Sequence, residues 1–125
     1  MRERLESLLE RYSDIIASVE EFSLVERPGV AVLRLKLNLR DASTLYIREI
    51  WVRGRLEAYS YYRIVEGEVS EGWNNARHHP DIRTFPHHKH VGGRVEPLET
   101  PSLEAFLEAV RRALEDQAGE VRDRS

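Results

Sequence analysis

Leu33-Arg34-Leu35-Lys36-Leu37-Asn38-Leu39-Arg40 alternates leucine with a polar or basic residue over its whole length. Successive side chains of a β-strand point to opposite faces of the sheet, so this period of two predicts a strand with one buried and one solvated face. The polar residues Asp41–Ser43 follow and predict a hairpin turn into a β-branched and aromatic strand over Thr44–Arg53. This part of the chain therefore favours an antiparallel sheet.

Turn residues at short intervals extend this sheet in both directions. Connections this short leave no room for the crossovers that parallel strands need. We therefore expect an antiparallel meander of four or five strands. The other expected strands are Phe22–Glu26, Leu56–Val65 and Glu68–Trp73, and the expected turns are Arg27–Val30, Gly54–Arg55 and Glu66–Gly67.

An apolar stripe with helical spacing occurs near each end of the chain. The stripe from Leu5 to Val19 predicts one amphipathic helix over Arg2–Glu20. The stripe from Leu103 to Leu114 predicts a second helix, which needs a start and an end signal. For these signals we take Thr100 as the N-cap, Pro101 as the first helical residue and Gly119 as the end.

The expected fold class is α+β. It consists of an N-terminal amphipathic helix, a four- to five-stranded antiparallel meander, a histidine-rich loop and a C-terminal helix. A chain of 125 residues has the usual size of one domain, and we place that domain at residues 1–119, with a frayed tail over residues 120–125.

Composition excludes several classes of protein. A hydrophobic content of 41% with 33% charged residues indicates a globular chain and not a disordered one. The absence of cysteine excludes disulfides and thiolate metal sites. There is no long apolar run and no signal peptide at the start, so we expect a soluble cytoplasmic protein that does not bind membranes. High charge with one Met and one Gln is typical of a thermophile.

All five histidines lie in one short window: His78, His79, His87, His88 and His90. Pro80 and Pro86 interrupt this segment, which predicts a loop or two short extended pieces before Gly92–Gly93. In an extended chain His88 and His90 share one face, whereas adjacent histidines do not, so about three of the five can converge. Imidazole changes charge near neutral pH and is a common metal ligand.

Three interpretations of these histidines stay open. As an acid and a base, imidazoles could cleave RNA through attack of the 2′-hydroxyl without a metal ion. Three of them, with Asp81 or Glu49, could instead bind zinc or another divalent ion. Some or all could be structural. Glu49 interrupts the apolar pattern of its strand and is a candidate catalytic base or histidine-orienting group, or else a cross-strand ion-pair partner.

Candidate substrate-binding residues surround the histidines. The segment Asn74–Arg94 carries four basic residues and one acidic residue in a chain of net charge −3, which predicts phosphate binding or, alternatively, a loop of salt-bridged arginines. Aromatic residues could stack on bases or pack in the core, and amides could bind substrate or close a turn. The candidates are Arg77, Arg83, Lys89, Arg94, Tyr59, Tyr61, Asn74 and Asn75.

Three motifs resemble the TumE family of toxins from type II toxin–antitoxin modules. They are Tyr59-Ser60-Tyr61, Trp73-Asn74-Asn75-Ala76-x-His78-His79-Pro80 and Thr84-Phe85-Pro86-His87-His88-Lys89-His90, and the similarity runs from about Phe22 to Leu114. Family members usually have Asp where this chain has Asn74 and Pro where it has Arg77. If that Asp were a catalytic or metal-binding carboxylate, this protein would be attenuated.

The resemblance implies a growth-inhibiting toxin that is neutralised by an antitoxin with a helix-turn-helix DNA-binding domain. A helix followed by a meander also resembles the ribonuclease toxins of the RelE–barnase type, at the level of the fold only. We therefore expect a toxin that acts on RNA, with the histidines as acid and base. The alternatives are a non-enzymatic module that binds protein or RNA, and a histidine-ligated metal site. A homodimer is also open.

Overall fold

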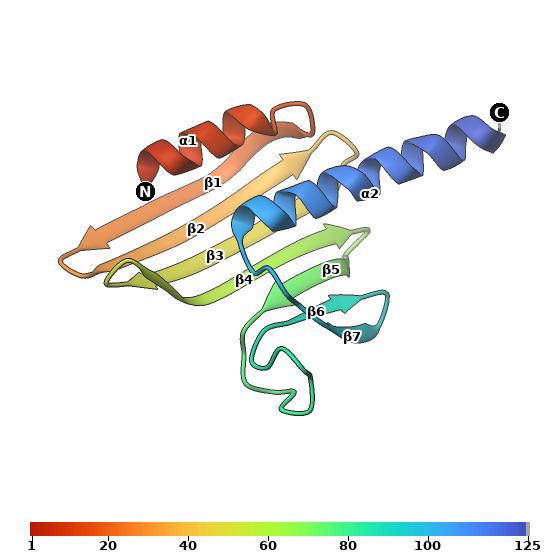
Figure 1. Cartoon of the computed structure of the whole chain (residues 1–125). Coiled ribbons are helices and arrows are strands. Elements are labelled where there is room, and N and C mark those ends of the chain that lie inside the picture. Colours follow the sequence, from red (N-terminus) through yellow and green to blue (C-terminus); the bar gives the residue numbers. More distant parts are fainter. Residues whose placement is uncertain (125) are drawn as a thin grey trace.

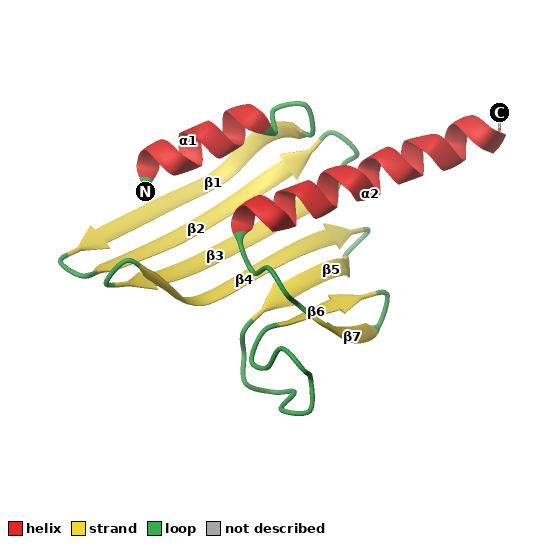
Figure 2. Ribbon diagram, viewed as in Figure 1, coloured by secondary structure: helices red, strands yellow, loops and turns green. Residues whose placement is uncertain are grey.

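The computed structural model of the protein describes residues 1–124, with side chains of the last helix described up to Gly119. Two helices lie on one face of an antiparallel sheet (Figure 1), and Figure 2 shows that loops occupy the rest. The α+β class is confirmed, but the described residues form seven strands, not four or five, in the order β1 to β7. The elements are α1 (Arg2–Arg11), β1 (Ile16–Arg27), β2 (Val30–Leu39), β3 (Thr44–Val52), β4 (Arg55–Val65), β5 (Glu68–Asn74), β6 (His88–Val91), β7 (Arg94–Pro97) and α2 (Leu103–Arg124).

The predicted N-terminal helix is too long. Helix α1 ends at Arg11, because Tyr12 leaves the helical conformation (φ −104°, ψ 20°) and a turn leads into β1 at Ile16. Ile16 pairs with Leu39 of β2, and Val19 pairs with Leu37. The apolar spacing of Ile16 and Val19 fits a helix as well as a strand. Because β-branched residues fit a pleated strand well, pairing with β2 makes this segment a strand.

The two strands that the prediction missed lie after the histidine loop. Strands β6 and β7 form a hairpin whose turn is Gly92–Gly93, with φ values of 55° and 80°. Strand β6 also pairs with β5, so His88 and His90 stand on a strand and not on a loop. Each of these strands has only four residues, which is too short for an alternation of apolar and polar residues to be recognised in the sequence.

The β3–β4 turn also differs from the prediction by one residue. Its central residues are Arg53 and Gly54, with φ values of 51° and 76°, and β4 already begins at Arg55. Two positive φ values in a two-residue loop match the twist of the flanking strands. The predicted turns at Arg27–Val30 and Glu66–Gly67 are confirmed.

Helix α2 has different ends from those predicted. It begins at Leu103, and the hydroxyl of Ser102 accepts a hydrogen bond from the backbone N–H of Ala105 (3.1 Å), so Ser102 and not Thr100 is the N-cap. The helix continues through Gly119 to Arg124. The side chains of the predicted frayed tail, residues 120–125, lie outside the described part of the chain.

The hydrophobic core lies between the helices and the sheet face below them, which we call the covered face. Phe106 of α2 packs against Tyr61 of β4 (5.5 Å between ring centroids) and edge-on against Trp73 of β5 (5.3 Å). Full burial of each large apolar side chain contributes roughly 1.5–3 kcal/mol. Leucines from α1, β2, β3 and α2 fill the rest of this layer: Leu5, Leu8, Leu33, Leu37, Leu45, Leu103 and Leu107.

The opposite face of the sheet carries no helix in the described residues, and we call it the open face (Figure 1). Neither described helix contains an apolar stretch that could span a lipid bilayer. Because no described helix covers the open face, the polar side chains that the strand register brings together there lie on a surface that ligands can reach.

Candidate functional site

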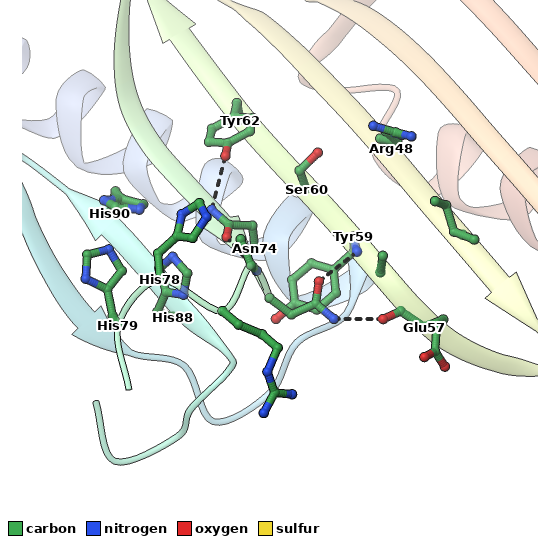
Figure 3. A pocket seen from close by; sticks show the side chains of 15 residues that line it. Arg48, Glu57, Tyr59, Ser60, Tyr62, Asn74, His78, His79, His88 and His90 are labelled. Carbon is green, nitrogen blue, oxygen red and sulfur yellow. Dashed lines mark hydrogen bonds between the residues drawn. The ribbon is translucent and has the colours of Figure 1, made fainter. Parts of the chain in front are cut away.

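A pocket of about 520 Å³ lies on the open face where β3, β4, β5 and the β5–β6 loop meet (Figure 3). Its lining includes Arg48 and Ile50 from β3 and Ser60 and Tyr62 from β4. Four of the five histidines also line it: His78, His79, His88 and His90. The sequence pointed to the histidines but did not single out Arg48 or Ser60 as site residues.

The sheet register brings these residues together. Arg48, Ser60, Asn74 and His88 stand directly opposite one another on β3, β4, β5 and β6, so they form one row across four strands. Side chains of directly opposed residues lie about 5 Å apart at Cβ. The alternation of β3 and β4 predicts that Arg48 and Ser60 point away from the core. Their position beside the histidines depends on how β4, β5 and β6 pair, which the sequence does not show.

Gly72 allows Tyr62 to approach the site. A Cβ atom at Gly72 would lie 2.5 Å from Cδ1 of Tyr62, so only glycine leaves room for the ring over β5. The hydroxyl of Tyr62 then accepts a hydrogen bond from Nδ2 of Asn74 (3.1 Å), while Oδ1 of Asn74 accepts one from the N–H of Ala76 (3.0 Å). Asn74 therefore fixes the start of the histidine loop with both ends of its amide.

Asn75 fixes the same part of the loop. Its Nδ2 donates to the carbonyl of Glu57 (2.9 Å), and its Oδ1 accepts from the N–H of Tyr59 (3.1 Å), as the dashed lines in Figure 3 show. Both predicted amides line the pocket, and both already have protein partners. Asn74, at the end of β5, bonds to Tyr62 of β4 and closes the turn that follows β5. Asn75 joins the first residue of the loop to the backbone of β4.

Three imidazoles converge at one end of the pocket. The ring centroids of His79 and His88 lie 4.9 Å apart, those of His88 and His90 5.1 Å, and those of His79 and His90 5.8 Å. One ring nitrogen from each lies within 4.8 Å of the other two. We call these three residues the histidine cluster. His78 lines the same pocket but is exposed and outside the cluster.

His88 is the buried member of the cluster, with 2% of its surface exposed. Its Nδ1 lies 3.0 Å from the carbonyl oxygen of Pro86, which can only accept, so Nδ1 carries the hydrogen. In neutral His88 the lone pair is then on Nε2. Burial, and then the neighbouring His88 and His79, lower the pKa of His90 below its ordinary value, which favours neutral imidazole there.

His87 is separated from the cluster. Its Nδ1 shares a hydrogen bond with the hydroxyl of Tyr59 (2.9 Å), and the two rings stack with centroids 5.8 Å apart. Burial, and then His88, lower the pKa of His87. Burial raises the pKa of the Tyr59 hydroxyl, so this group stays protonated. His87 therefore anchors the loop to β4 and does not line the pocket.

Glu49 and Tyr61 lie on the covered face, away from the histidines. The carboxylate of Glu49 accepts hydrogen bonds from Tyr61 Oη (2.6 Å), Arg4 Nη1 (3.1 Å) and Trp51 Nε1 (3.1 Å). Burial, and then the charge of Glu49, raise the pKa of Tyr61. The structure does not bring Glu49 together with the cluster, and exposed Asp81 is not part of it either.

Most of the predicted phosphate-binding cations are paired with acids. Arg83 forms an ion pair with Glu99, while Lys89 and Arg94 lie 4.0 Å and 3.4 Å from Glu96. Both acids follow the positive segment in the sequence, so counting charge over Asn74–Arg94 left them out. Arg77 lines the pocket with its guanidinium 4.8 Å from the ring of Phe85. Among the described residues neither Arg77 nor Arg48 forms an ion pair.

Comparison with known proteins gives one match. A model of the protein family described as Toxin TumE matches residues 5–118 of this chain. No curated protein and no solved structure matches. The matched range includes all three motifs from which the resemblance was drawn, and that resemblance is confirmed.

Proposed function

Because the chain belongs to the toxin TumE family, and is therefore a toxin of the toxin–antitoxin kind, we propose that it acts on RNA in the pocket of the open face. The family implies an antitoxin partner. That this partner carries a DNA-binding domain stays a prediction.

The main support is Arg34 and Arg48 on the open face, which form no ion pair within the described part of the chain. Arg34 of β2 stands directly opposite Arg48 of β3, and the row continues through Ser60 and Asn74 to His88. Like charges directly opposite each other in a sheet destabilise it slightly, and a bound anion removes this repulsion. A phosphate chain lying along this row would contact Arg34 and Arg48 and reach the histidines.

Two tyrosines on the same face suit a single-stranded nucleic acid. Tyr46 of β3 and Tyr62 of β4 stand opposite each other in the register, and Tyr46 is 43% exposed. Flat aromatic rings on a sheet surface stack on unpaired bases. Tyr59 and Tyr61, for which base stacking was predicted, have buried rings that a base cannot reach. We therefore assign base stacking to Tyr46 and Tyr62.

The imidazoles supply the proton transfers that RNA cleavage needs. A base removes the proton from a 2′-hydroxyl, the oxygen attacks the adjacent phosphorus, and an acid gives a proton to the departing 5′-oxygen. The product is a cyclic 2′,3′-phosphate. We assign these two steps to His78 and to the histidine cluster, since both line one pocket.

The test uses purified full-length protein and labelled single-stranded RNA. Cleavage is expected, with a cyclic phosphate at the 3′ end of the product, and a deoxyribose at the cut position should abolish it. Arg48→Ala should weaken RNA binding about tenfold and lower the slope of log affinity against log salt by about 0.7. Arg83→Ala, which removes a cation already paired with Glu99, is the control and should change neither.

Two outcomes would overturn parts of this function. RNA binding without any cleavage would identify a non-enzymatic binding module. Absence of both binding and cleavage, together with unchanged toxicity of His78→Ala and His88→Ala variants, would show that RNA is not the target of this pocket.

A further inference from the structure

We propose that His79, His88 and His90 bind one divalent transition-metal ion, with Zn²⁺ as the best fit to their chemistry. One nitrogen of each imidazole lies within 4.8 Å of the other two. Tetrahedral zinc with Zn–N bonds of about 2.0–2.1 Å requires nitrogens about 3.4 Å apart. Small side-chain rotations of His79 and His90, which are both half-buried, close this difference around the fixed His88.

His88 is already oriented as a metal ligand. The carbonyl of Pro86 holds the hydrogen on its Nδ1, so neutral His88 directs the lone pair of Nε2 away from that bond. Histidine ligands usually donate their second ring nitrogen to a carbonyl or carboxylate in this way, which fixes the tautomer and the ring. Within the described residues, His79 and His90 make no hydrogen bond that a metal ion would have to break.

The donor set selects the kind of ion. Three neutral nitrogens without a carboxylate favour Zn²⁺ and its transition-metal neighbours over Mg²⁺ and Ca²⁺, which prefer oxygen. Three protein ligands also leave a fourth position of a tetrahedron open, as in catalytic zinc sites. Since His79, His88 and His90 line the pocket, an ion bound to them would border the space that Arg48 and Tyr62 also line.

A bound ion would change the assignment of the proton-transfer groups. The cluster would then act through a water or phosphate oxygen at the open position of the ion, and His78 would remain the free imidazole. This catalytic role rests on the proposed RNA function, whereas binding of the ion does not.

The binding test uses the full chain without a histidine tag, stripped with a chelator and titrated with ZnCl₂ by calorimetry. One zinc ion per chain is expected. His79→Ala and His90→Ala should each weaken zinc binding at least about 100-fold. His78→Ala is the matched control, because it removes the adjacent exposed imidazole of the same pocket and should bind zinc like the wild type. Circular dichroism checks that each variant is folded.

Co²⁺ provides an independent readout of the ligands. A tetrahedral cobalt site gives intense visible absorption, which should appear in the wild type and in His78→Ala and be lost in His79→Ala. Absence of stoichiometric zinc binding in the wild type would overturn the metal site. Equal loss of binding in His78→Ala would overturn the choice of ligands.

RNA cleavage with and without chelator separates this inference from the proposed function. Loss of cleavage on chelation and its recovery with zinc supports a catalytic ion. Full cleavage after chelation overturns the catalytic role of the ion and leaves metal-free acid–base chemistry. Stoichiometric zinc with no cleavage supports the metal site and contradicts the proposed function.

Discussion

Each face of the sheet buries polar side chains, and Glu49 on the covered face differs from His88 on the open face in its number of hydrogen-bond partners. Glu49 on the covered face is fully buried, and its carboxylate accepts hydrogen bonds from three separate residues. His88 on the open face is 2% exposed, and among the described residues its ring makes one hydrogen bond, to the carbonyl of Pro86. The ring of His88 belongs to a group of three imidazoles at the edge of a pocket.

This difference separates a structural polar group from the one that we propose to be functional. A buried carboxylate whose two oxygens both accept hydrogen bonds from protein donors stabilises one arrangement and has little left to offer a ligand. A ring that is fixed on one side and free on the other is prepared to bind. Departure from an apolar pattern, which drew attention to Glu49 in the sequence, does not distinguish the two cases.

The largest expected effect is the loss of stability in Glu49→Ala. The substitution leaves Arg4, Trp51 and the hydroxyl of Tyr61 without their acceptor. It should lower the free energy of unfolding by roughly 3 kcal/mol, at the low end for a broken buried pair because Arg4 is 25% exposed. Urea denaturation measures this loss. Glu57→Ala, an exposed glutamate on β4, should stay within about 0.5 kcal/mol of the wild type.

His79→Ala should show the opposite behaviour, with activity lost and stability kept. The ring of His79 is half-buried and contributes one of the three imidazoles of the cluster. RNA cleavage should fall about 100-fold or more, equivalent to about 2.7 kcal/mol, while the melting temperature stays near that of the wild type. A parallel fall in melting temperature would place His79 with Glu49 as a structural residue.

Gly72→Ala should perturb the open face alone. The new methyl group would displace the ring of Tyr62 and break its hydrogen bond with Asn74. Overpacking of this kind costs about 1–2 kcal/mol, and RNA binding should weaken with it. The double variant Gly72→Ala with Tyr62→Ala should be no less stable than Tyr62→Ala alone. If Gly72→Ala costs the same in both backgrounds, contact with Tyr62 is not the reason for glycine at this position.

The smallest expected effect is a change in acid stability that depends on the ion pair between Asp41 and Arg63. Burial would raise the pKa of Asp41, but hydrogen bonds from Ser43 and the ion pair with Arg63 outweigh it and leave the pKa lowered. A lowered carboxyl pKa adds stability above the unfolded value of about 3.9, and this stability is lost as pH falls through the folded value. Melting temperatures between pH 6 and pH 3 should fall less steeply in Asp41→Asn. Identical curves would show that the pair does not control acid stability.

The central strands could be predicted because their signals are local. Leucine alternation defines β2, and the polar turn after it starts β3 within a few residues. The end of α1 could not be predicted, since Ile16 and Val19 fit a helical stripe as well as a strand until β2 pairs with them. Strands β6 and β7 depend in the same way on β5, which comes before the histidine loop.

The candidate site was predictable where one strand contains it. His88 and His90 share a face because they are two residues apart on an extended chain. The position of His79 depends on the path of the loop, and that of Arg48 on the register of three strand pairs. Of the two interpretations of the positive segment, salt-bridged arginines apply to Arg83 and Arg94, because Glu99 and Glu96 pair with them from outside the histidine segment.

Arg4 links the two ends of the chain, since its guanidinium contacts both Glu49 and Glu104, and Glu104 lies 100 residues further on. Closing so long a loop carries a high entropic cost, so such contacts form after local ones. The meander can assemble hairpin by hairpin as the chain leaves the ribosome. The covering layer is completed only by α2, so a nascent toxin gains the stability of this layer only after that helix has left the ribosome.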